Sequence, residues 1–204
     1  MISLSVSTPV LHAQPLSIID QHGNPLANAV IEIQTKQAFR SINDTPYIMD
    51  QVNKTFVPVV LIIPKHSSIE FPNSDNIRHH VYSFSNAKPF ELRLYSGKPE
   101  APLEFNNEGI VILGCNIHDS MVGYIYVANS SYTFQSNSQG VIELDTLPKD
   151  ITAVFVWHPH LNQGSHRRLE LSLSQLRSDQ PVKLNITPPA PRNTFEAKFK
   201  RISP

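Results

Sequence analysis

Short apolar runs interrupted by proline constrain the fold of this chain more than any other feature of its sequence. The 17 prolines are spread from end to end, and no stretch of about 12 residues keeps an uninterrupted apolar stripe at helical spacing. Segments rich in β-branched and aromatic residues recur instead between Gly, Pro, Asn and Asp, as they do in antiparallel sandwiches. The sequence therefore predicts an all-β protein with few helices.

The expected strands share this composition and are bounded by turn residues. They are Leu16–Ile19, Ala29–Gln34, Val57–Ile63, Ser68–Pro72, His79–Phe84, Phe90–Leu94, Leu103–Phe105, Ile110–Leu113, Gly123–Val127, Tyr132–Gln135, Val141–Leu144, Ile151–Trp157 and Val182–Ile186.

Charge and cysteine content exclude several classes of protein. The 17 Lys+Arg and 17 Asp+Glu residues cancel, so nothing favours nucleic acid or an anionic membrane as the main partner. No run approaches the roughly 18 to 20 apolar residues that a membrane-spanning helix needs, so we expect no membrane span. The single Cys115 excludes an internal disulfide and leaves a buried thiol, a nucleophile or a metal ligand.

Residues 1–13 are uncharged and mildly apolar, and they end in Leu-His-Ala. This composition is typical of the end of a secretory signal peptide, although the positively charged start is missing. The segment could otherwise be an ordinary first strand. The export interpretation predicts a periplasmic protein.

One short segment combines three metal-binding side chains. Cys115, His118 and Met121 lie within seven residues, between two expected strands. Thiolate and thioether sulfur together with neutral imidazole suit copper in both of its common oxidation states. A second imidazole could come from His79 or His80. Zinc remains an alternative, but a methionine is a poor ligand for it, and each residue alone could be a core side chain.

In this region the chain resembles the cupredoxins, the type I copper proteins, over about 80 residues. The Cys-x-x-His-x-x-Met spacing is most similar to that of amicyanin, and the Tyr124–Val127 segment is similar to the closing strand of that family. In plastocyanin-like sequences the histidine ligand outside the Cys-His-Met loop lies eight residues after an aromatic residue of a strand. Counted from Phe71, that position is His79. His80 then occupies a position where Asn is usual.

The resemblance implies one mononuclear type I copper, held by Cys115, His79 and His118 with Met121 as a weak axial ligand. It further implies an apolar surround that keeps water out, for which we expect Phe71, Val81, Phe84, Val111 and Leu113.

Two other segments resemble a different fold. The turn at 20–26 with its flanking strands is similar to the opening hairpin of the carboxypeptidase regulatory-like (transthyretin-like) sandwich, and 132–148 to a later hairpin of it. We therefore expect two β-sandwiches: a Greek-key cupredoxin domain at 49–129, inserted into a transthyretin-like or Ig-like sandwich at 14–48 plus 130–190, with a tail at 191–204.

The remaining histidines carry less information. His158 and His160 would point to the same face of a regular strand, but Pro159 between them disrupts that geometry. We therefore expect this segment to pack against the protein rather than to form a second metal site, with Trp157 in the core. The scattered histidines are expected to be solvated: His12, His22, His66 and His166.

The function expected from these features is that of a periplasmic single-electron carrier, or of a copper module for a redox partner protein, without catalysis of its own. The alternatives are copper storage or delivery, and binding without redox work.

Overall fold

The computed structural model describes residues 14–37, 39, 44–99, 101–118, 120–144 and 146–188. The chain is an all-β sandwich protein, as predicted, and in the described residues its one α-helix is the single turn α1 (Leu173–Leu176). The expected leader at 1–13 and tail at 191–204 lie outside the described residues. No described helix is long and apolar enough to cross a membrane.

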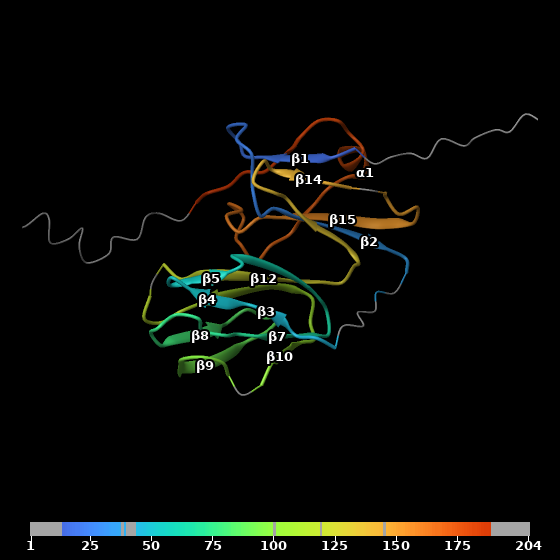
Figure 1. Ribbon diagram of the computed structural model, residues 1–204. Coiled ribbons are helices and arrows are strands. Elements are labelled where there is room, and N and C mark those ends of the chain that lie inside the picture. The colour runs from blue at the N-terminus through green and yellow to red at the C-terminus, as the bar shows by residue number, and fades with distance from the viewer. Residues whose placement is uncertain are drawn as a thin grey trace, which may run out of the picture.

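The upper half in Figure 1 combines strands from two distant parts of the sequence. One sheet has the order β13-β2-β15-β16, and a smaller one the order β14-β1-β17. Their bounds are β1 Leu16–Ile19, β2 Val30–Thr35, β13 Tyr132–Gln135, β14 Val141–Ile142, β15 Ile151–Trp157, β16 Leu169–Glu170 and β17 Val182–Lys183.

The lower half is formed by the strands between these two parts (Figure 1). A five-stranded sheet of order β6-β12-β11-β8-β9 is accompanied by the sheet β10-β7-β3 and the hairpin β4-β5. The bounds are β3 Tyr47–Ile48, β4 Asp50–Val52, β5 Thr55–Val57, β6 Val60–Pro64, β7 Ser67–Glu70, β8 His79–Ser83, β9 Phe90–Tyr95, β10 Leu103–Phe105, β11 Gly109–Gly114 and β12 Val122–Ala128.

Two expected strands, at 141–144 and 182–186, are shorter in the structure, and a third was wrong in its course. The sequence predicted a single strand over Val57–Ile63, but β5 ends at Val57 and β6 begins at Val60. Pro58 has no N–H to donate to a ladder, and the chain changes partner there, from β4 before it to β12 after it.

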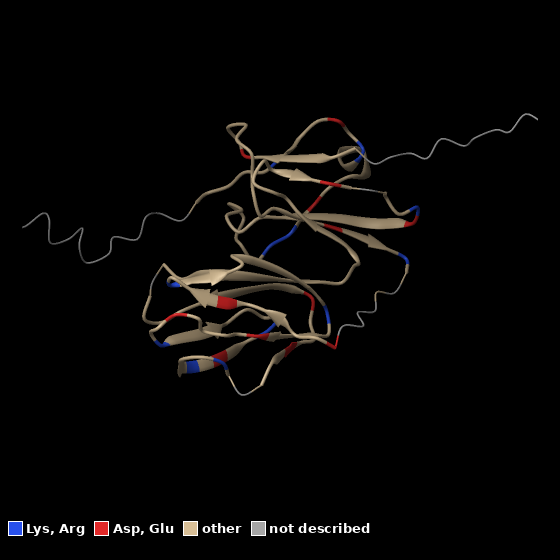
Figure 2. Cartoon of the chain, in the orientation of Figure 1, with Lys and Arg blue, Asp and Glu red and all other residues tan. Residues whose placement is uncertain are grey.

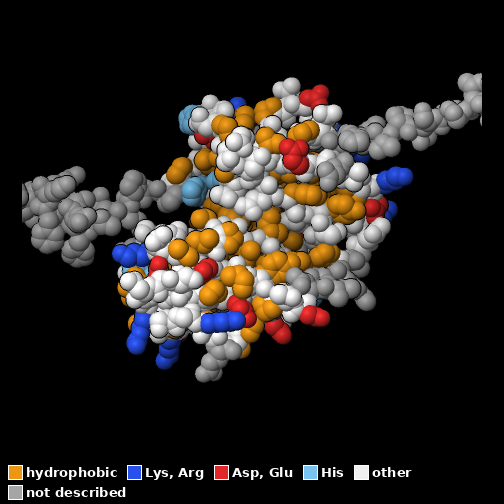
Figure 3. Space-filling view, viewed as in Figure 1, with side chains coloured by type: hydrophobic (Ala, Val, Ile, Leu, Met, Phe, Trp, Pro, Cys, Tyr) orange, Lys and Arg blue, Asp and Glu red, His pale blue; other side chains and the backbone are white. Residues whose placement is uncertain are grey.

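The interior strand β12 is buried on both faces. Tyr124 and Tyr126 belong to the core shared with the upper half, whereas Ile125 and Val127 belong to the core of the lower half. This alternation follows from the two-residue period of a strand. Figure 3 shows the resulting band of hydrophobic side chains where the two halves meet.

A buried carboxylate also joins the halves. Glu32 of β2 has no exposed surface, and its carboxylate accepts hydrogen bonds from the Tyr126 hydroxyl (2.7 Å), the Asn129 amide (2.9 Å) and the Arg168 guanidinium (2.7 Å). Burial raises the pKa of Tyr126, so the phenol stays protonated and donates. The carboxylate is thus satisfied from both halves, which fixes their register against each other.

Candidate metal centre

Cys115, His118 and Met121 lie on the loop that connects β11 to β12. Gly114 and Val122 form the last pair of that antiparallel ladder, so residues 115–121 close it. Within the loop the Met121 amide donates to the His118 carbonyl over 2.9 Å, which turns the chain back toward β12. A short, internally bonded loop holds its side chains close together.

His79 reaches the same place from the neighbouring strand. It is the first residue of β8, which pairs with β11 through Tyr82 and Gly114, and its side chain is fully buried. The β8–β9 register shifts between His79 and Val81. His80, at this irregularity, bonds instead to Glu91 through Nε2 over 2.9 Å.

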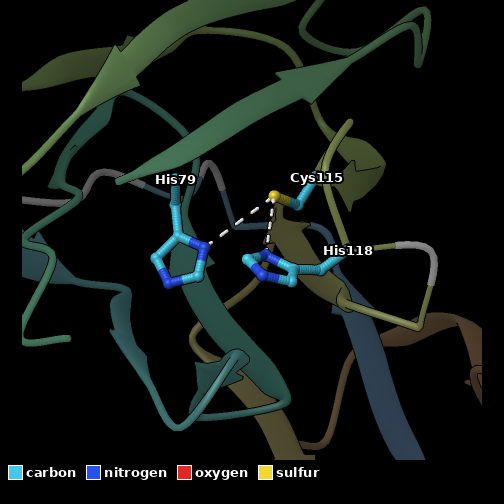
Figure 4. Close-up of side chains that lie close together, drawn as sticks. All are labelled: His79, Cys115 and His118. Carbon is cyan, nitrogen blue, oxygen red and sulfur yellow. Dashed lines mark hydrogen bonds between the residues drawn. The ribbon is translucent and has the colours of Figure 1, made fainter. Parts of the chain in front are cut away.

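The structure therefore brings His79, Cys115 and His118 together and leaves His80 outside the group (Figure 4). The Cys115 Sγ lies 3.9 Å from Nδ1 of His79 and 3.7 Å from Nδ1 of His118. The candidate ligand atoms all lie within 4.8 Å of one another, and the two imidazole rings are 4.9 Å apart between centroids. Both histidines present Nδ1 to the sulfur.

These separations fit one shared metal ion. Metal–sulfur and metal–nitrogen bonds of about 2.3 and 2.0–2.1 Å, set at trigonal or tetrahedral angles, place sulfur and nitrogen about 3.6 to 3.8 Å apart. Met121, on the same loop, is 1 % exposed and belongs to the same apolar cluster as Cys115. The donor set of one thiol, two imidazoles and one thioether matches the preferences of copper.

Asp75 anchors the buried histidine and was missed in the sequence analysis. Its Oδ2 lies 2.7 Å from His79 Nε2. The same carboxylate accepts hydrogen bonds from the amides of Asn53 (2.6 Å) and Lys54 (2.9 Å) in the turn between β4 and β5. These hydrogen bonds hold the pKa of Asp75 below its usual value, and the bond from the Lys54 amide has the largest effect. An ionised carboxylate on Nε2 keeps the proton there and leaves Nδ1 free for a metal.

His118 is the more accessible of the two histidines. Burial, together with the neighbouring His79 and Lys54, lowers its pKa. The imidazole is therefore neutral at pH 7, which is the form that binds a metal.

The expected apolar surround is confirmed in four of its five members. Phe71, Val81, Val111 and Leu113 are buried in the lower core, but Phe84 is 86 % exposed. Phe84 was wrongly placed because it lies three residues after Val81 and therefore on the opposite face of the strand line. Its ring lies instead beside Tyr82, 5.2 Å away.

The histidines outside the centre pack as expected. His158 is buried and lies 3.2 Å from the Ala27 carbonyl through Nε2, while its Nδ1 accepts from the His160 amide. Trp157 is fully buried. Exposed positions are occupied by His22, His66 and His166, while His12 lies outside the described residues.

Comparison with known proteins finds partial likeness to copper proteins. No family model and no curated protein matches the chain. Among solved structures, a copper-containing nitrite reductase from Thermus scotoductus SA-01 is 24 % identical over 46 % of this chain and 25 % of its own length, with a TM-score of 0.39.

Two further neighbours are small copper proteins. A purple cupredoxin from Nitrosopumilus maritimus is 23 % identical over 42 % of this chain and 100 % of its own, with a TM-score of 0.35. An amicyanin variant in the reduced state is 18 % identical over 48 % of this chain and 97 % of its own, with a TM-score of 0.34. Each likeness covers less than half of the chain.

Proposed function

We propose that the chain binds one mononuclear type I copper through His79, Cys115 and His118, with Met121 as a longer axial ligand. The observation that carries the proposal is the convergence of both Nδ1 atoms on the Cys115 sulfur. A buried methionine on the same loop favours copper over zinc.

The proposed activity is the transfer of single electrons to and from a redox partner protein. Copper in such a site supplies a one-electron couple. The chain's own residues hold the ligands in place: Asp75 fixes His79, and the turn from His118 to Met121 fixes the loop. Because the surrounding core excludes water, little needs to reorganise when the charge changes.

The two halves support a proposed domain division. The sheets divide near the proposed bounds, with 49–129 proposed as a cupredoxin domain inserted into a carboxypeptidase regulatory-like sandwich of 14–48 plus 130–190. Only β3, at 47–48, pairs across the first bound, with β7. Acidic and basic residues are interspersed on both halves in Figure 2, which fits a locally recognised protein partner rather than a polyanion. The proposed location is the periplasm, and the proposal assigns no catalytic turnover to the chain.

Copper delivery is the second candidate, because two sulfur donors favour the reduced ion. Voltammetry of the copper-loaded protein separates the two functions. A fast, reversible one-electron wave is expected of a carrier. Tight Cu(I) binding with sluggish electron exchange would overturn the carrier proposal in favour of delivery.

A further inference from the structure

The upper half covers part of one face of the five-stranded sheet, and a groove lies at the edge of the covered area. Its volume is about 1070 Å³. The floor is the outer face of β11 and β12, with Ile110, Ile112 and Val122, and it continues the buried face that the two halves share. A site of this size with an apolar floor suits a drug-sized organic molecule.

One wall of the groove is aromatic. Tyr82 and Phe84 line it with ring centroids 5.2 Å apart and ring planes inclined by 46°. Phe84 is 86 % exposed, far more than any other large apolar side chain recorded as exposed in the described residues. An adjacent, uncovered pair of rings offers offset or edge contacts to a planar aromatic ligand.

The groove lining also includes hydrogen-bond acceptors. His160 and His166 line it from the upper half, and burial lowers the pKa of His160, which keeps that imidazole neutral with one acceptor nitrogen. Glu108 lines the groove as well; its Oε1 lies 3.4 Å from the Arg168 guanidinium, and its Oε2 is buried without a hydrogen-bond partner among the described residues. Acceptors and aromatic rings in one groove select a flat ligand that carries hydroxyl donors.

The groove lies behind the candidate metal centre. Gly114 and Ser120 line it, and these residues neighbour Cys115 and Met121 in sequence. A Cβ on Gly114 would lie 2.7 Å from the Tyr82 ring, so that ring lies directly against the backbone next to the cysteine. A ligand in the groove therefore touches the outer face of β11 and β12. The loop that joins these two strands carries Cys115 and Met121, two of the predicted metal ligands.

We propose that this groove is a binding site for a planar aromatic alcohol or diol. The ligand stacks on Tyr82 and Phe84 and donates its hydroxyl groups to His160 and His166. The site does not depend on a bound metal.

Calorimetric titration of the metal-free full chain with 2,3-dihydroxynaphthalene tests the proposal, with 2,3-dimethoxynaphthalene as a probe of similar shape that lacks donors. We expect saturable binding of the diol and weaker binding of the ether. Phe84→Ala should weaken diol binding about two- to twelve-fold, the range for one aromatic contact. Leu94→Ala removes another exposed apolar side chain, one that does not line the groove, and should leave the affinity unchanged.

Amide NMR shifts locate the bound probe, and the largest are expected at Gly114 and Ser120. The proposal is overturned by the absence of saturable binding at millimolar diol, by equal affinity for the two probes, by an unaffected Phe84→Ala variant, or by shifts that cluster elsewhere. Because the titration uses metal-free protein, failure of the chain to bind copper would remove the electron-transfer proposal and leave this one standing.

Discussion

Neutralising Asp75 should raise the reduction potential of the copper-loaded protein. The carboxylate oxygen lies 2.7 Å from His79 Nε2 and its side chain is 12 % exposed, so its charge is poorly screened. A negative charge on the ligand ring favours the more positive, oxidised ion, and Asp75→Asn removes that charge while keeping an acceptor beside the ring.

The size of the effect follows from the hydrogen bond. A bond to a charged group contributes about 1.5–3 kcal/mol and a neutral one about 0.5–1.5, so the exchange weakens it by about 1–1.5 kcal/mol. If the weaker hydrogen bond destabilises only the Cu(II) form, the ratio of the Cu(II) affinity to the Cu(I) affinity drops about tenfold. A tenfold change corresponds to about 59 mV for one electron, so we expect a rise of about 40–60 mV.

Asp50→Asn is the matched control. Asp50 accepts hydrogen bonds from Ser74 in the neighbouring loop and from the Gln51 amide in its own strand, and none from His79. Redox titration of both variants measures the difference. If Asp75→Asn moves the potential no further than Asp50→Asn does, the reasoning about the carboxylate is refuted.

Three further predictions concern stability, each measured by chemical denaturation. Burial, with help from His160, lowers the pKa of His158 to about 4. The stability that the neutral imidazole contributes is therefore present above the unfolded pKa near 6.5 and is lost as the pH falls toward 4. A His158→Gln variant should lose less unfolding free energy between these pH values, and an identical pH profile would contradict the assignment. Gly123→Ala should cost about 1–3 kcal/mol, because its Cβ would lie 2.7 Å from that of Phe56, and a neutral result would show that Phe56 yields easily. Glu32→Ala should cost about 3–5 kcal/mol by removing the acceptor that the Tyr126 hydroxyl, the Asn129 amide and Arg168 share, and Glu32→Gln should cost less; equal costs would argue that the charge is unimportant.

The strands were predictable wherever local pattern and burial agree. β11 and β12 are continuous apolar runs because one face lies in the lower core and most of the other in the core shared with the upper half, and the sequence located them. The hairpin β4–β5 was missed because its short strands carry polar residues and owe their position to tertiary contacts, among them the bonds from Asn53 and Lys54 to Asp75.

The candidate site was only partly predictable for the same reason. Cys115, His118 and Met121 share one loop, so their proximity is local and visible in the spacing. Asp75 precedes His79 by four residues in a segment without regular structure, and nothing local indicates that its carboxylate turns toward the imidazole. The exposure of Phe84 could have been found by counting strand parity from Val81.

The visible and electron paramagnetic resonance spectra of the copper-reconstituted protein test the central claim most directly. The proposed ligand set predicts an intense thiolate-to-Cu(II) charge-transfer band that disappears in Cys115→Ser, since Cys115 is the chain's only cysteine. A colourless protein that binds zinc stoichiometrically, or a copper spectrum unchanged by Cys115→Ser, would contradict it.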